Sequence, residues 1–330
     1  MSAEHQPTAA VYRRFADVEA CGRSPLYESL ALNAAEDEEV LGFLSTLPAE
    51  KRQPNLLFAA VRYRIGAAVE WRDFRIALLR DAESIRRLMM ERSTQTNEPA
   101  RCATLLPILA ELPQPLALIE VGASAGLRLL PDCYGYDYGS VRLSADRQPC
   151  FRCVTNGDAP VPRALPQIAW RIGLDLHPLD VSNQEDRAWL EALVWPEQTG
   201  RLEHLRAAFE VALTAEPRVV AGDLRYDLAK LTRNAPADAT LVIFHTAVLA
   251  YVPSMVDCRS FASEARRLAA FWIANEAPHV LPEIAAGAGP SGEAFMLSVN
   301  GAPVAWTDPH GASMTWIGRS AGRAREASLT

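Results

Sequence analysis

The chain has 330 residues, a net charge of −7 and a sequence pI near 5.5. This acidic balance provides no general basic field to attract nucleic acid. Hydrophobic residues make up 49% of the chain and charged residues 22%, as in ordinary globular proteins, and no apolar run is long enough to span a bilayer. The first residues lack the basic start and apolar centre of a signal peptide. We therefore expect a cytoplasmic protein that acts on a small molecule, without a nucleic-acid or membrane partner.

The first hundred or so residues read as helices. Ser24 followed by Pro25 is a typical helix cap and first helical position. Arginines alternate with acidic residues over 62–92, which predicts a solvated, ion-paired surface. We expect a helical N-terminal domain over residues 1–112 and an α/β domain over residues 113–330.

Residues 116–127 read LALIEVGASAGL. The apolar run predicts a strand buried on both faces, which leads into Glu120 and then Gly122, Ser124 and Gly126. Small residues there favour a tight turn whose backbone N–H groups can approach a ligand. A helix beginning at about Ser124 would point its positive dipole end at that ligand. The dinucleotide fingerprint GxGxxG does not match, because two of its three glycine positions hold other residues.

Polar residues crowd the stretch 91–101, which reads ERSTQTNEPAR. Asn97 fits a helix N-cap and Pro99 an early helical position. Because loops often carry function, the segment is either a capped loop or one wall of a polar ligand site. In the second case the substrate-binding residues are Gln95, Thr96, Asn97, Glu98 and Arg101.

Residues 131–166 are rich in turns and aromatic residues. The dipeptide at residues 156–157, Asn-Gly, is a strong hairpin signal, so we expect an inserted β-hairpin subdomain or lid. Tyr134, Tyr136 and Tyr138 either line a pocket or, as is more common for aromatic residues in an insertion, form its core.

The six cysteines are scattered, as reduced thiols usually are in a cytosolic chain. Cys150 and Cys153 form one CxxC pair without a second pair at zinc-site spacing. We therefore predict no metal site.

Later apolar runs end in polar residues that suit a ligand. The run IAWRIGLDL contains Asp175 near its end, where Rossmann-like folds bind both ribose hydroxyls. A second run ends at Asp223, a third continues into His245, and a fourth ends at Glu276. Two apolar runs around an Asn-Gly pair over residues 295–306 predict a final hairpin.

Taken in order, these strand ends resemble the motifs of class I S-adenosylmethionine-dependent methyltransferases. The turn after the first strand is similar to the family's ExGxGxG motif, with serine in the middle glycine place. The resemblance implies a Rossmann-like, mostly parallel sheet closed by an antiparallel hairpin, in which Asp223 meets the adenine amine. It also implies an S-adenosylmethionine site formed by Glu120, Gly122, Ala123, Ser124, Gly126, Asp175, Asp223 and His245.

Nearly the whole chain also resembles a bacterial family known as domain of unknown function 2332. The matching segments are TQTNE at 94–98, the glycine-rich turn, the WRxGxDxxPxDV stretch at 170–181, and FHT at 244–246. That family brings no established activity. The first and second motifs lie farther apart here than in ordinary methyltransferases.

These residues support three alternative functions. In a methyltransferase the protein mainly aligns donor and acceptor, and His245 would be the base or acceptor-orienting group, with Tyr251 and Glu276 beside it. His245 could instead be a satisfied histidine at a strand end. The second function is a non-catalytic sensor of an adenosyl ligand or nucleotide. The third is a hydrolase, because residues 122–126 match the GxSxG elbow with Ser124 as nucleophile, followed by Asp223 and His245.

Overall fold

The computed structural model describes residues 5–95, 97–286, 288 and 292–318. The chain divides into two compact units. A helical unit comprises residues 1–96 and 183–203, and an α/β unit comprises residues 97–182 and 204–330. The sequence places the boundary at residue 112; here residues 97–112 lie in the α/β unit, and residues 183–203 lie in the helical unit.

The helical unit is built from helices that pack around aromatic side chains. Ser24 caps its second helix, where its hydroxyl oxygen accepts the N–H of Tyr27 at 3.1 Å, as predicted. The Phe58 ring lies at the centre and contacts the rings of Tyr12, Tyr27 and Phe74. The helices are α1 (Gln6–Arg14), α2 (Pro25–Ala34), α3 (Glu38–Ser45), α4 (Pro54–Ile65), α5 (Trp71–Arg80), α6 (Ala82–Glu91) and α8 (Gln184–Leu193), with a π-helical turn at Phe15–Ala20 and a 3-10 turn at Ala49–Lys51.

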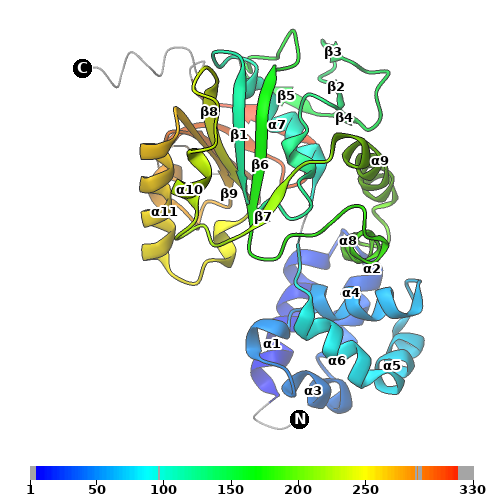
Figure 1. The fold of residues 1–330 in the computed structure, drawn as a ribbon. Coiled ribbons are helices and arrows are strands. Elements are labelled where there is room, and N and C mark those ends of the chain that lie inside the picture. The colour runs from blue at the N-terminus through cyan, green and yellow to red at the C-terminus, as the bar shows by residue number, and fades with distance from the viewer. Residues whose placement is uncertain (1–4, 96, 287, 289–291, 319–330) are drawn as a thin grey trace. The chain divides into compact units, whose positions relative to one another are not determined.

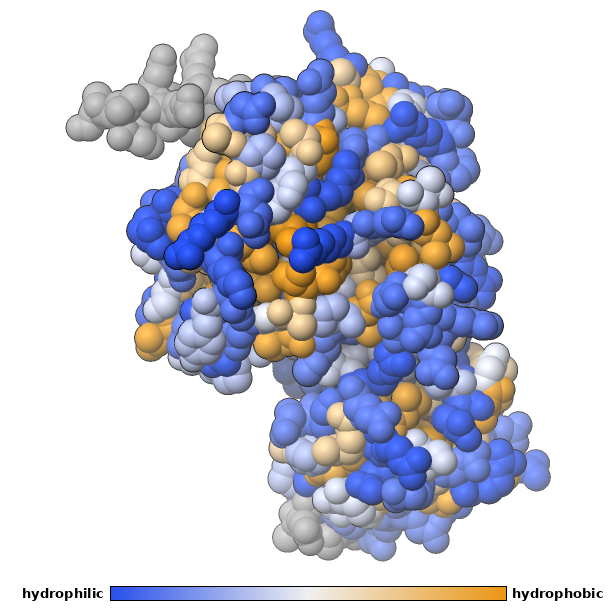
Figure 2. Space-filling view, viewed as in Figure 1, coloured by the Kyte–Doolittle hydropathy of each residue, from blue (hydrophilic) through white to orange (hydrophobic). Residues whose placement is uncertain are grey.

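The outer surface of the helical unit carries the ion pairs that the sequence predicts. Arg75 on α5 pairs with Asp37 at 2.6 Å, and Arg86 on α6 pairs with Glu83 at 2.8 Å. Figure 2 shows hydrophilic residues over most of the visible surface of this unit. The charged stretch is therefore a solvated face.

All of the strands of the described chain belong to the α/β unit, together with five α-helices (Figure 1). Its helices are α7 (Cys102–Leu109), α9 (Thr199–Ala215, which starts in the helical unit), α10 (Leu228–Thr232), α11 (Met255–Leu268) and α12 (Pro282–Ala285). Its strands are β1 (Leu116–Val121), β2 (Gly135–Asp137), β3 (Arg142–Leu143), β4 (Cys150–Arg152), β5 (Val154–Asn156), β6 (Ile168–Asp175), β7 (Val219–Ala221), β8 (Thr240–Thr246), β9 (Phe271–Glu276), β10 (Phe295–Val299), β11 (Ala302–Thr307) and β12 (Ser313–Trp316).

In the described chain, one sheet of nine strands has the order β5-β12-β11-β10-β9-β8-β1-β6-β7. The strands β9, β8, β1, β6 and β7 run parallel to one another. Strand β10 pairs antiparallel with β9 and β11, β12 pairs antiparallel with β11, and β5 pairs parallel with β12. The fold is thus mixed α/β with a large, mostly parallel central sheet. The fully buried β1 lies inside this sheet, as its continuous apolar run predicts.

Helices α10 and α11 cover one face of the parallel strands (Figure 1). Val121 of β1 packs there with Leu228 of α10 and Phe261 of α11. Because side chains alternate along a strand, Glu120 points to the opposite face. None of the helices in the described ranges combines the length and apolar character that crossing a membrane requires.

The insertion at 131–166 contains a hairpin, but not at the predicted turn: β2 and β3 pair antiparallel across residues 138–141. Strands β2, β3 and β4 form a separate small sheet, and β5 joins the edge of the main sheet beside β12. Residues 156–157 end β5 instead of connecting two paired strands, because the backbone of Trp316 lies against Gly157 and takes the place of a returning strand. The three tyrosines of β2 and its flanks are buried, and their hydroxyls donate to backbone carbonyls, so they form a core: Tyr134, Tyr136 and Tyr138.

The predicted C-terminal hairpin is present as β10 and β11. Its turn residues Asn300 and Gly301 have φ of 51° and 82°, which a two-residue hairpin turn of this type requires. Strand β12 extends the hairpin and was not predicted, because its four residues carry no long apolar run.

Candidate functional site

The order of the parallel strands places a topological switch point between β1 and β8. The chain passes from β1 to β6 and β7 on one side, and then crosses back to β8 and β9 on the other. In open α/β sheets, ligands bind outside the carboxyl ends of the strands at such a point. The residues that follow β1, β6, β7 and β8 therefore define the candidate site.

The turn after β1 does not lead into the α-helix expected at Ser124. Ser124 and Gly126 have φ of 51° and 72°, which lie outside the right-handed helical region and stop a helix from propagating. Only a 3-10 turn, Leu127–Leu129, follows. The prediction of a helix dipole directed at a ligand was therefore wrong.

Asp175, at the end of β6, joins two of the strand ends. One carboxylate oxygen accepts the N–H of Ser124 at 2.7 Å, and the other accepts the N–H of His177 at 2.8 Å. The carbonyl oxygen of Asp175 accepts the N–H of Gly222, which follows β7, at 2.9 Å. Asp175 thus holds the turn after β1 beside the turn after β7.

The glycines near the switch point make room for protein side chains. A Cβ atom at Gly122 would lie 2.3 Å from the Val248 side chain, and one at Gly173 would lie 2.5 Å from Ala123. Gly122 also has a φ of +71°, which favours glycine. In the described chain the turn after β8 therefore packs directly on the turn after β1.

Glu120 forms a buried ion pair with Arg128. Both side chains are almost fully buried, and the Nε of Arg128 donates to Oε1 of Glu120 at 2.5 Å. Arg128 also donates to the carbonyl oxygen of Gly122 at 2.8 Å, so it pins the turn as well as the acid. Arg128 was not predicted from the sequence. The one feature that could have indicated this ion pair is that Arg128 follows Glu120, an acid within an apolar run, by eight residues.

Burial gives Glu120 an unusual titration. Desolvation raises the pKa of Glu120 from 4.5 to about 7, although the positive charge of Arg128 opposes the shift. The folded protein then holds this proton more tightly than the unfolded chain, so the contribution to stability is present below about pH 4.5 and is lost as the pH rises through about 7.

We therefore expect the free energy of unfolding to contain a term that falls by about 3 kcal/mol between pH 4 and pH 8. Urea denaturation of the wild type and of Glu120→Gln across this range measures it. The free energy of unfolding of the wild type minus that of Glu120→Gln should fall as the pH rises from 4 to 8. A difference that is constant with pH would contradict the assignment.

Asp223 follows β7 and pairs with Arg225 at 2.6 Å. The Arg225 side chain, through hydrogen bonds and charge, holds the pKa of the Asp223 carboxyl below its usual value despite some desolvation. Arg225 also reaches Asp257 of α11 at 3.4 Å. The two acids and their shared arginine form a charged group beside the ends of β7 and α11.

The register of the sheet separates His245 from Glu120. Glu120 pairs with Phe244, and Val121 pairs with His245, so His245 points to the face that α11 covers. His245 is fully buried there, stacked on Trp272 and edge-on to Phe261. The two residues that the resemblance groups in one site therefore lie on opposite faces of the sheet.

Glu276 holds His245 and the turn after β8. One carboxylate oxygen of Glu276 lies 2.7 Å from Nδ1 of His245 and accepts the N–H groups of Val248 at 2.9 Å and Leu249 at 3.3 Å. Tyr251, two residues farther on, is 60% exposed. In this conformation Tyr251 is accessible to a substrate, whereas His245 is not.

The polar segment at 97–101 lies at the ends of β8 and β11. Arg101 is buried and donates to the carbonyl oxygen of Thr246 at 3.1 Å and to that of Pro309 at 2.7 Å. The helix cap is Glu98, whose carboxylate accepts the N–H of Ala100 at 3.3 Å, and not Asn97 as predicted; the helical turn begins one residue later than expected.

The other two residues predicted for this wall are not among the described residues of the α/β unit. Gln95 belongs to the helical unit, and Thr96 lies outside the described residues. Asn97, Glu98 and Arg101 thus remain as the members that the α/β unit holds beside the strand ends.

Several buried polar atoms near these strand ends have no hydrogen-bond partner in the described part of the chain. Buried polar groups are normally bonded, and exceptions mark strain, water or a ligand site. The groups with such atoms are the side chains of Asn97, Glu120, Ser124, His245, Asn275 and Glu276. They provide donors and acceptors on both sides of the switch point.

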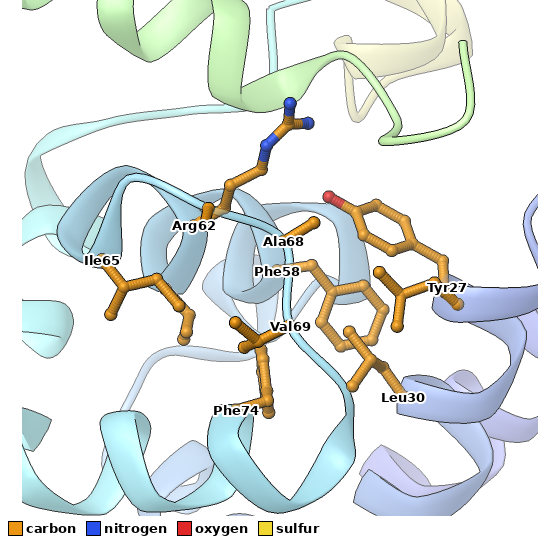
Figure 3. A pocket seen from close by; sticks show the side chains of 11 residues that line it. Tyr27, Leu30, Phe58, Arg62, Ile65, Ala68, Val69 and Phe74 are labelled. Carbon is orange, nitrogen blue, oxygen red and sulfur yellow. The ribbon is translucent and has the colours of Figure 1, made fainter. Parts of the chain in front are cut away.

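Two other features can be set aside. The apolar cavity between α2, α4 and α5 in the helical unit, with Tyr27 and Phe58 in its wall (Figure 3), measures about 10 Å³ and so holds one water at most. Within the described ranges, no group of three or more His, Cys, Asp or Glu side chains is placed to bind a metal ion.

Comparison with curated proteins and with solved structures finds no match. The profile of one protein family, described as "Uncharacterized protein conserved in bacteria (DUF2332)", matches residues 9–316. This match covers both units. The chain therefore belongs to the DUF2332 family of bacterial proteins.

Proposed function

We propose that the chain binds S-adenosylmethionine at the carboxyl ends of β1, β6 and β7 and transfers its methyl group to a small molecule. The observation that carries this proposal is Asp175, which joins the turn after β1 to the turn after β7 at the switch-point edge. An acid at this place suits the ribose hydroxyls of a nucleoside ligand. The order of motifs along the chain supports an adenosyl ligand.

The surroundings of Asp175 fit the remainder of an adenosyl group. Leu176 and Tyr226 are 61% and 76% exposed, and they follow β6 and β7 respectively. Exposed apolar and aromatic side chains of this kind provide a surface for a purine ring. Asp223, which follows β7, is the proposed partner of the adenine amine.

The structure suggests different roles for three residues than the motif resemblance implies. We assign Glu120 to holding the turn through Arg128, because its carboxylate pairs with that arginine. We assign Glu276 to holding the turn after β8, since it accepts two N–H groups of that turn, and His245 to supporting Glu276, since His245 is closed to solvent. Tyr251 remains the acceptor-side residue. When bound, the sulfonium supplies the reactive methyl group, and the protein aligns the acceptor with it.

Titration calorimetry with S-adenosylmethionine and S-adenosylhomocysteine tests binding, with a matched pair of variants. Asp223 and Asp257 both pair with Arg225, but only Asp223 has a proposed ligand contact. We expect Asp223→Asn to weaken binding by about tenfold, the value of one lost hydrogen bond to a charged group. Asp257→Asn should bind within about twofold of the wild type.

The outcomes separate the alternatives. The absence of binding to either compound, or equal affinities of the two variants, would refute this site. Binding without formation of S-adenosylhomocysteine from any acceptor tested would favour the sensor function. Labelling of Ser124 by a fluorophosphonate would favour the hydrolase, whose nucleophile also lies on a turn with positive φ.

A further inference from the structure

We propose that a second site, on the outer side of α11, binds a small organic anion with an apolar body. A cavity of about 520 Å³ opens there between α11, α12 and the turn that joins β10 to β11. This volume lies within the range of ordinary ligand pockets. All of its lining residues belong to the α/β unit, so the cavity is complete within that unit.

The rim of the cavity is basic. Arg259, Ser263, Arg266 and Arg267 line it from α11, at the spacing that places residues on one helical face. Glu283 is the acid of the lining. Three guanidinium groups around one opening, against the carboxylates of Glu283 and Glu264, leave a net positive charge there.

The three arginines differ in how they are engaged. Arg259 lies 3.5 Å from Glu283, and Arg267 lies 3.7 Å from Glu264, both with exposed side chains. Exposed pairs at these distances are weak. Arg266 has no carboxylate partner in the described part of the chain. Its guanidinium is therefore the group best placed to bind an anion.

Apolar side chains lie at the inner wall of the cavity, although polar atoms make up the larger part of its exposed surface. Trp272 and Leu281 are 1% and 4% exposed and line it together with Ile284. Gly301 faces Arg266, since a Cβ atom there would lie 3.5 Å from the guanidinium nitrogen. The missing side chain keeps the space beside Arg266 open.

This lining determines the class of ligand. A guanidinium group binds a carboxylate or phosphate through two parallel hydrogen bonds, and the apolar wall favours an aromatic or aliphatic body. A cavity with an apolar wall and a few convergent polar groups is the usual form of a small-molecule site. The ligand therefore joins an apolar ring or chain to a carboxylate or phosphate.

The cavity is separate from the switch-point site. Trp272 is the second residue of β9, whereas Glu276, at the other end of β9, belongs to the switch-point edge. Four residues of extended strand place these ends about 13 Å apart. The anion site thus neither needs nor tests S-adenosylmethionine binding.

The test uses three probes that share a naphthalene body: 1-naphthyl phosphate, 1-naphthoate and neutral 1-naphthol. Titration calorimetry of the full chain at low salt should show saturable binding of one or both anions, at least tenfold tighter than that of naphthol. The stronger anion identifies the preferred headgroup. Equal binding of all three probes would show an apolar cavity only and would overturn the proposal.

Variants locate the binding. Arg266→Gln should weaken anion binding at least tenfold, and Ser263→Trp, at an exposed position of α11, should block the cavity. Arg163→Gln, at an exposed position in the loop before β6, is the control and should bind as the wild type does. Circular dichroism and thermal melting confirm that each variant is folded. Unchanged affinity in both cavity variants, or no saturable anion binding by the wild type, would refute the site.

Discussion

Replacement of Arg128 by methionine is expected to lower the free energy of unfolding by about 3–5 kcal/mol at pH 8. The substitution keeps much of the side-chain volume but leaves the Glu120 carboxylate buried without its ion-pair partner. It also removes the hydrogen bond to the carbonyl oxygen of Gly122. Urea denaturation measures the loss.

The same variant should be less destabilised at pH 5 than at pH 8. Burial already raises the pKa of Glu120 to about 7, and loss of Arg128 raises it further, so at pH 5 the carboxyl is neutral and its desolvation cost is smaller. Arg128→Met combined with Glu120→Gln should recover part of the stability at pH 8. Arg142→Met, which breaks an exposed pair with Asp137, is the control and should change stability by less than about 1 kcal/mol. Equal losses in the two arginine variants would contradict the buried pair.

Replacement of Gly311 by alanine is expected to cost about 3 kcal/mol of unfolding free energy. Gly311 has a φ of +85°, where a Cβ atom is strained by about 1–2 kcal/mol. That Cβ would also lie 2.3 Å from the carbonyl oxygen of Ala100, a backbone atom that cannot rotate away. Overpacking of this kind adds about 1–3 kcal/mol.

Gly139 provides a matched control for this prediction. Its φ of +81° is nearly the same, but a Cβ atom there would meet nothing within 4 Å. Gly139→Ala should therefore show the backbone strain alone. If chemical denaturation gives the same loss for both variants, Gly311 does not support the 98–101 segment as described.

A displaced segment at 98–101 should also affect ligand binding. Arg101 donates to the backbone at Pro309, in the same turn as Gly311, and to Thr246 at the end of β8. The two stability predictions thus test two contacts that hold the switch-point edge. The first is the buried ion pair of Glu120 with Arg128, and the second is the packing of Gly311, in the turn after β11, against Ala100.

Local patterns predicted the elements of the parallel sheet. An apolar run indicates a buried strand: β1 and β9 are buried along their whole length, whereas β6 and β8 are buried only along part of theirs. The cap at Ser24 was equally local, because its side chain accepts a hydrogen bond from its own helix. The same reasoning predicted Asn97 as the N-cap, whereas the N-cap is its neighbour Glu98, because side chains of both types can accept the N–H of a helical residue.

Non-local contacts decided what the patterns could not. The Asn-Gly pair at 156–157 is a hairpin signal only if the next strand returns beside the first, and here the neighbour of β5 is the distant β12. The helix expected at Ser124 does not form, because Ser124 and Gly126 both have positive φ. In this conformation the N–H of Ser124 donates to Asp175, and Gly126 packs beside Pro217.

By itself, the amino-acid sequence determined the class of fold, the strands of the parallel sheet and the acids at their ends, because each depends on residues adjacent along the chain. Only the tertiary structure decided which of those side chains meet. The register between β1 and β8 directs Glu120 to Arg128 and His245 to Glu276 on opposite faces. Register is a relation between segments more than a hundred residues apart, and a shift of one residue would exchange the two faces.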